Sequence, residues 1–157
     1  MRLEPLYRLR FDYPESWGVE VKGEGGSEEQ HFLYASGSVE GRVAGRFRGT
    51  NYARRRTDRT FLTDFTAVIE TTDNATILLE CQGFGRSHKP EYDRVSPEGR
   101  QWVATLKHLS ENERYRWLND VVCVGTGQVR SKPTANPTNP SDLVLDVAEL
   151  IWEPIPK

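Results

Sequence analysis

Two acidic side chains of one predicted strand are the first candidates for chemistry in this chain. Asp64 and Glu70 fall on the same face of the segment 61–71, whose other face is apolar. Six residues of extended chain span about 20 Å, so the two carboxylates cannot act together on one atom. Each would need a partner from a neighbouring strand. A carboxylate in that position is a candidate general base, with an arginine holding an enolate, carboxylate or phenolate.

The arginines that could serve as partners lie just upstream. Arg42, Arg46 and Arg48 alternate along one predicted strand and share a face, and Arg46 and Arg48 are candidates to bind substrate. If this face points inwards together with Asp64 and Glu70, the charges line a cavity, which is costly unless they are paired or used. If it points to water, the same residues are ordinary surface ion pairs. The sequence leaves both placements open.

A second basic cluster follows in the sequence NYARRRTDRT. Tyr52, Arg54, Arg55 and Arg56 occupy a turn-like stretch, where binding residues often gather at the mouth of a barrel. An arginine fork there suits a carboxylate or an oxygenated ring, so all four are candidate substrate-binding residues. The alternative is a solvated charge run. Aromatic and basic residues also interleave in nucleic-acid grooves, but the near-neutral chain argues against that use.

Histidine supplies the remaining acid-base candidate. His31, His88 and His108 are too scattered to match the spacing of metal ligands, so we expect no catalytic metal, and we expect no cofactor. His108 lies near Trp117 and Asn119 in sequence, which predicts a pocket where it acts as an acid or base beside these two binding residues. The alternative is a structural, hydrogen-bonded histidine.

Glycines at a spacing of four indicate which elements position these groups. Gly37, Gly41, Gly45 and Gly49 would share one face of an extended chain with small or apolar neighbours, opposite a cationic face. A membrane-helix interface or a phosphate loop needs flanking residues that this segment lacks. The spacing instead indicates strands that bend or cross closely, as at barrel corners.

Most of the chain has the alternation of half-buried strands. The predicted strands are 3–12, 31–37, 39–50 with a break near 40–41, 61–71, 75–82, 102–108, 121–129 and 143–152. The segment from Trp102 also fits a helical stripe through Leu106 and Leu109, and a strand is the favoured interpretation. Residues 14–30, 86–99 and 131–141 are predicted loops, and a capping box at 110–113 predicts a short helix or turn to about residue 119. A long antiparallel sheet tends to remove its edges, so the predicted fold is all-β, a closed barrel of about eight to ten strands.

Composition narrows the function classes. The 157 residues fit one domain spanning 1–157, and their formal net charge is −2. That charge argues against a dedicated nucleic-acid or membrane-surface binder. The N-terminal segment has no apolar stretch for export or for crossing a bilayer, so we expect a cytoplasmic protein. Cys81 and Cys123 form no CxxC pair and are expected to be buried and reduced.

A family resemblance rests on four segments, LEPLYRLRFD, GSVEGRVAGRFRGT, FLTDFTAVIETTDNATILLECQGFGR and RYRWLND. Together they resemble the DUF3237 family, also called UPF0311, over most of the chain. The resemblance implies a lipocalin-like or allene oxide cyclase-like barrel. The chain departs from the family pattern in the arginines 54–56 and in a longer Pro/Asn-rich loop near its end. The family has no settled activity, so the resemblance informs the fold more than the function.

Two functions fit these residues. The first is a cofactor-independent enzyme of the isomerase, cyclase or lyase type that acts on an oxygenated hydrophobic molecule, with Asp64, Glu70 or His108 transferring protons. The second is a non-catalytic, lipocalin-like carrier that uses the same pocket. The expected partner is a small molecule, with no nucleic acid and no membrane, and a homo-oligomer stays open. A perturbed carboxylate facing a cavity would favour the enzyme, an all-apolar interior would favour the carrier, and a barrel filled with side chains would exclude both.

Overall fold

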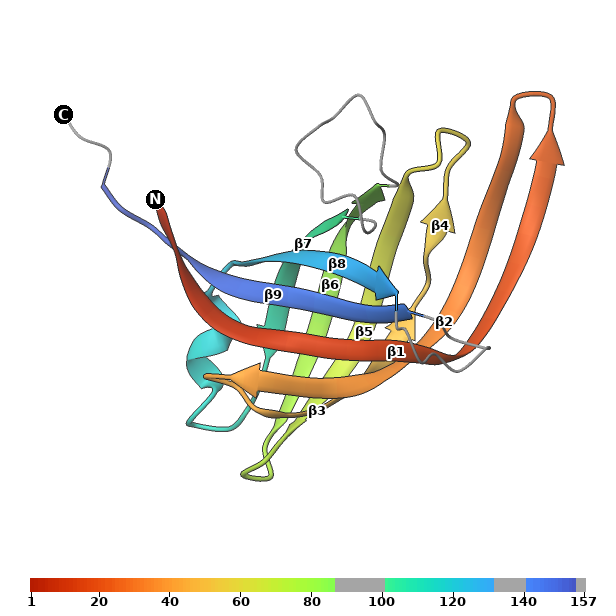
Figure 1. The fold of residues 1–157 in the computed structure, drawn as a ribbon. Helices are drawn as coiled ribbons and strands as arrows, with labels where there is room; N and C mark the ends of the chain where they lie inside the picture. Colours follow the sequence, from red (N-terminus) through yellow and green to blue (C-terminus); the bar gives the residue numbers. More distant parts are fainter. Residues whose placement is uncertain (87–100, 132–140, 155–157) are drawn as a thin grey trace.

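Nine strands in one antiparallel sheet form most of the described chain (Figure 1). The computed structural model describes residues 1–86, 101–131 and 141–154. The strands are β1 (Arg2–Gly23), β2 (Gly26–Gly41), β3 (Gly45–Asn51), β4 (Arg54–Arg55), β5 (Phe61–Thr71), β6 (Thr76–Arg86), β7 (Gln101–Leu109), β8 (Cys123–Ser131) and β9 (Ser141–Ile151), with one 3-10 helix, η1 (Arg116–Asp120), after β7. The prediction of an all-β, antiparallel fold is confirmed.

The sheet curves into a barrel-like shape. Its strand order is β1-β9-β8-β7-β6-β5-β3-β2-β4, and β1 pairs with β2 as well as with β9. The ladder therefore leads back to the strand on which it begins. In Figure 1, β1 and β9 cross in front of β5, β6 and β7 at a steep angle, and the core lies between these two sets of strands.

The inner face of the sheet is apolar, as the glycine spacing predicts. Phe47, Phe65 and Leu106 are among its fully buried side chains. Gly37 lies opposite Phe11 in the β1–β2 ladder, and a Cβ atom on Gly37 would lie 2.6 Å from the Cα atom of Phe11. Only glycine allows the two strands to approach so closely. The glycines therefore shape the curvature of the sheet.

Several predicted elements agree with the structure. β5 spans the predicted segment 61–71 and forms the expected hairpin with β6, and β7 and β9 lie where strands were predicted. The predicted break at 40–41 falls at residues 42–44 instead, and the capping box at 110–113 precedes a short 3-10 helix that begins only at Arg116. The predicted loops at 86–99 and 131–141 lie almost entirely outside the described residues.

The loop predicted for residues 14–30 is wrong. β1 and β2 continue through it as a long hairpin that projects beyond the other strands at the right of Figure 1. We call residues 15–34 the arm. Its ladder runs from Glu15–Tyr34 to Gly23–Gly26, after an irregularity between Asp12 and Glu15. The Gly, Glu and Ser content that indicated a loop conceals apolar residues at every second position.

Candidate functional site

The charged candidates lie on the outer face of the sheet and pair with one another. Glu70 accepts hydrogen bonds from Arg46 Nη2 at 3.1 Å and from Arg48 Nη2 at 2.9 Å, and all three side chains are more than a third exposed. Arg46 and Glu70 also line an open outer groove of about 730 Å³. Asp64, likewise exposed, accepts a hydrogen bond from Gln82 Nε2 at 3.2 Å. The sequence left open whether these residues face the interior or the solvent, and in the structure they face the solvent.

The consecutive arginines after β3 form ion pairs with acidic residues of the same chain. The pairs are Arg54–Glu28 at 2.5 Å, Arg55–Glu29 at 3.6 Å and Arg56–Asp58 at 3.0 Å. The first two join β4 to the arm, where β4 also pairs with β2. Tyr52 is 58% exposed on the segment that leads into this cluster. Arg54 and Arg55, predicted to bind substrate, therefore link the arm to β4.

Asn119 joins η1 to the end of β7, and Trp117 contacts the turn between β2 and β3. Asn119 accepts a hydrogen bond from the Ser110 N–H at 2.8 Å and donates one to the Ser110 carbonyl at 3.0 Å. The Arg42 guanidinium lies 4.7 Å from the centre of the Trp117 ring. These contacts lie next to His108 in sequence. They give both residues a structural role at this end of the sheet.

His108 is the predicted acid-base group that the structure places on the inner face. It forms a pair with Tyr7, and each residue is 5% exposed. The Tyr7 hydroxyl lies 2.7 Å from His108 Nε2, and the two rings meet edge to face with centroids 5.8 Å apart. Nδ1 of His108 has no hydrogen-bond partner among the described residues. A buried polar atom in that state indicates a place for a ligand or a water molecule.

Burial keeps this pair neutral at pH 7. It lowers the pKa of His108 from 6.5 to about 4. It raises the pKa of Tyr7 well above 10, with smaller contributions from Cys123 and Cys81. Burial also raises the pKa of Cys81 to about 12 and that of Cys123 to about 11, so both free thiols are protonated and poor nucleophiles.

The rest of the inner face is apolar, with aliphatic and aromatic side chains and a few neutral polar atoms. Asn51 Nδ2 donates a hydrogen bond to the Tyr13 hydroxyl at 2.9 Å, and Trp102 Nε1 donates one to Thr63 Oγ1 at 3.2 Å. The Phe65 ring stacks on both Tyr13 and Trp102. No Asp, Glu, Lys or Arg is among the buried side chains of the described residues. These side chains pack against one another in the hydrophobic core.

Sequence reasoning missed Tyr7, Tyr13 and Asn51. Within the predicted strand 3–12, Tyr7 alternates with Leu9 and Phe11, and a polar hydroxyl on that apolar face was the available signal. Tyr13 falls at the irregularity of β1, and Asn51 falls at the end of β3, where alternation carries little information.

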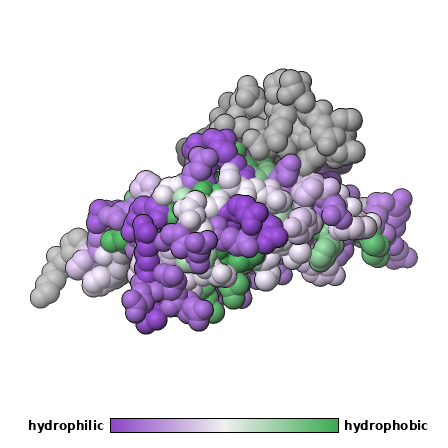
Figure 2. All heavy atoms as spheres, turned by 90° about the horizontal axis from the view of Figure 1, so that it is seen from below, coloured by the Kyte–Doolittle hydropathy of each residue, from purple (hydrophilic) through white to green (hydrophobic). Residues whose placement is uncertain are grey.

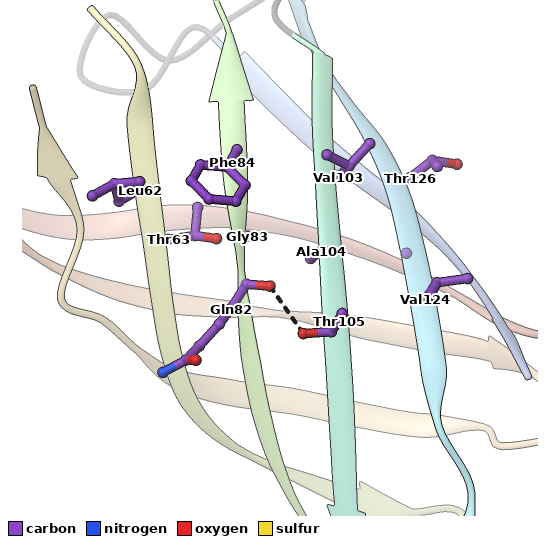
Figure 3. A pocket seen from close by; sticks show the side chains of 11 residues that line it. Leu62, Thr63, Gln82, Gly83, Phe84, Val103, Ala104, Thr105, Val124 and Thr126 are labelled. Atoms are coloured by element: carbon purple, nitrogen blue, oxygen red, sulfur yellow. Dashed lines mark hydrogen bonds between the residues drawn. The ribbon is translucent and has the colours of Figure 1, made fainter. Parts of the chain in front are cut away.

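An open groove on the outer face is a competing site (Figure 3). It lies over β5 to β8, has a volume of about 630 Å³, and is lined in part by Leu62, Phe84 and Val103. Its polar lining includes Gln82 and Thr105, joined by a hydrogen bond from Thr105 Oγ1 to the Gln82 carbonyl. None of its lining residues is titratable. The groove can hold an apolar group but offers no acid or base.

Neither a membrane-spanning helix nor a metal-ligand cluster is present among residues 1–86, 101–131 and 141–154. Within these ranges no helix is long and apolar enough to span a bilayer. The same ranges bring no three His, Cys, Asp or Glu side chains together as a metal-ligand set. His88 lies outside them. The cytoplasmic location stays a prediction.

The fold and these features agree with one family. The sequence profile described as "Protein of unknown function (DUF3237)" matches residues 1–149. The chain belongs to the DUF3237 family. The resemblance noted in the sequence is confirmed, while no protein of curated function matches the chain.

Solved structures share the fold of this DUF3237 protein at low sequence identity. A barrel-like protein from Acinetobacter baumannii has a TM-score of 0.74 and 20% identity, covering 94% of each chain. A protein of unknown function from Rhodopseudomonas palustris has a TM-score of 0.72 and 15% identity, covering 96% of this chain and 97% of its own. A protein from Penicillium herquei described only as an enzyme has a TM-score of 0.65 and 19% identity, covering 94% and 92%. At these identities the likeness shows the fold alone.

Proposed function

We propose that the inner face of the sheet binds a small, oxygen-bearing, largely apolar molecule and that His108 polarises its oxygen atom. The observation that carries this proposal is the buried Tyr7–His108 pair with an unpartnered Nδ1. With the Tyr7 hydroxyl donating to Nε2, the neutral imidazole carries its proton on Nδ1. That N–H is then a buried donor without an acceptor, and a ligand carbonyl oxygen would satisfy it.

The chemistry follows from the neutrality of this donor. A histidine whose pKa lies at about 4 is a weak base, but its neutral N–H stabilises negative charge that develops on a carbonyl oxygen. Tyr7 fixes the ring and its tautomer through Nε2. The buried side chains of the described residues include no carboxylate that could take a proton from carbon, so the α-proton of the ligand would pass to a water molecule or to a basic group of the ligand itself while the His108 N–H stabilises the oxygen. The reaction class is then a cofactor-independent rearrangement through an enolate-like state, as in an isomerase, cyclase or lyase. Asp64 and Glu70 have no part in it.

The inner face also limits the charge of the ligand. The buried side chains include no Lys or Arg among the described residues, so an anion would lose its hydration without gaining an ion pair. We therefore infer a neutral ligand. This inference replaces the expectation from the sequence, in which arginines stabilised an anionic ligand.

A carrier without turnover is the second candidate. The aromatic lining around Phe65 and Trp102 favours it, because such a lining binds apolar molecules whether or not a reaction follows. In the carrier, the His108 N–H would orient the ligand and no proton would move.

The experiment uses cyclohexanone and 2-cyclohexenone in D2O. Proton NMR measures protein-dependent exchange of their α-hydrogens, and saturation-transfer NMR measures binding of the same ketones. The test variants are Tyr7→Phe, which removes one hydroxyl, and His108→Gln. The control is Glu70→Gln, which alters an exposed ion pair on the outer face.

We expect the parent protein and Glu70→Gln to accelerate exchange equally, and the two inner-face variants to lose most of the acceleration while still binding ketone. Binding without exchange in the parent would support the carrier instead. Exchange that survives in both inner-face variants would refute a role for the pair. No ketone binding by the folded parent would refute both candidates.

A further inference from the structure

The arm has a long open edge on its β1 side. On its β2 side, β4 pairs with the arm at Glu29–Arg55 and Gln30–Arg54. Its β1 side is different, because the pairing of β1 with β9 stops at Phe11. In the part of the chain that the structure describes, no strand pairs with that side of residues 15–23. Every second residue there directs its backbone N–H and C=O groups outwards, and such an edge is a template for another strand.

The outer face beside this edge is unusually apolar. Trp17, Val19 and Val21 are 56%, 65% and 65% exposed, and Phe32, also exposed, contacts the Trp17 ring. Hydrophobic side chains are visible among hydrophilic ones on the arm, at the right of Figure 2. A long exposed edge with β-branched and aromatic residues favours strand pairing between molecules.

We propose that a second copy of this chain pairs with the arm, edge to edge and antiparallel, with the two-fold axis at Val19. In this register Val19 faces Val19 of the second copy, and Trp17 faces Val21. All residues from 15 to 23 are then paired, and the apolar row continues across the axis.

Charge disfavours one alternative register, and the length of pairing disfavours another. On the other face of the arm, Glu20 lies opposite Gly18 of the second copy, and Lys22 lies opposite Ser16. An axis at Glu20 would place two glutamates directly opposite each other, which destabilises a sheet. An axis at Val21 would pair only residues 19–23 and would leave Trp17 beyond the partner's turn. In the register at Val19, the exposed apolar row of one arm meets the same row of the other, which favours a second copy as the occupant.

Cysteine cross-linking tests the register in the full chain. Val19→Cys brings two thiols together across the axis, at a strand spacing that suits a disulfide. Val21→Cys is the matched control, because its symmetry mate is offset by four residues, or about 13 Å. The native Cys81 and Cys123 are buried and do not compete. Under mild oxidation we expect a disulfide-linked dimer from Val19→Cys and none from Val21→Cys.

Sedimentation across a concentration series tests the interface itself. Val19→Lys places two like charges across the axis and should weaken dimerisation about tenfold or more. Val103→Lys makes the same change on another exposed valine, in the outer groove, and should leave the dimer intact. The proposal is wrong if the parent is monomeric throughout, if Val103→Lys breaks the dimer instead, or if Val21→Cys cross-links as well as Val19→Cys.

Discussion

Replacing His108 with Gln should make the fold less sensitive to acid. The pKa of His108 in the folded protein is about 4, below its ordinary value of 6.5, because burial disfavours the imidazolium. Between these two pH values the unfolded chain binds more protons than the folded chain, so acid favours unfolding. The stability associated with neutral His108 is therefore fully present above pH 6.5 and is lost as the pH falls towards 4.

The magnitude follows from the two pKa values. Each pH unit between them corresponds to about 1.4 kcal/mol, so the complete loss is about 3 kcal/mol. Of this, about 2 kcal/mol falls between pH 7 and pH 5, above the range in which most carboxylates titrate. The effect is large against the usual net stability of a domain.

Urea unfolding at pH 7 and pH 5 measures the effect. We expect the free energy of unfolding of the parent to fall by about 2 kcal/mol more than that of His108→Gln. His31→Gln is the control, since His31 lies on the arm beside Glu29, and it should follow the parent. His108→Leu provides a second variant if Gln disturbs the core. Parallel profiles for the parent and both His108 variants would refute the argument, as would an NMR titration of His108 with a midpoint near 6.5.

Two further predictions test the packing. Gly37→Ala should lower the free energy of unfolding by about 1–3 kcal/mol, because its Cβ would lie 2.6 Å from the Phe11 Cα, whereas Gly23→Ala, with nothing within 4 Å, should have little effect in the same urea assay. Equal effects of the two would contradict the close approach of the strands. Cys81 and Cys123 should react with a thiol reagent at pH 8 only after unfolding, because burial raises the pKa of both thiols to about 12 and 11. Rapid labelling of the native protein would contradict that burial.

Alternation along single strands made part of the site predictable. The strand 61–71 and the inward side of His108 follow from a period of two, which depends only on local sequence. The glycine spacing likewise identified the apolar face. That face became the interior because the opposite face carries charges whose burial would be costly.

The Tyr7–His108 pair could not be predicted, because its members are separated by 101 positions and meet only through the strand order. The candidates chosen from the sequence were charged, since charged residues are the usual markers of acid-base chemistry. Asp64 and Glu70 nevertheless form surface contacts. In a sheet with one buried face, a ligand in the interior meets the few polar side chains among the apolar ones. The hydrogen-bond partners of these side chains come from strands that are distant in sequence.

The irregularity in β1 connects the core to the arm. Before it, Phe11 pairs with Gly37 and faces inwards. After it the register shifts by one, so that Trp17 pairs with Phe32 and the odd-numbered residues of β1 face outwards. A shift of one residue reverses every later side chain, because the period of a strand is two. One strand therefore supplies Tyr7 to the inner site and an apolar row to the outer face of the arm, although Tyr7, Trp17, Val19 and Val21 are all at odd positions. Without the irregularity, Trp17, Val19 and Val21 would turn to the other face of the arm, away from Phe32.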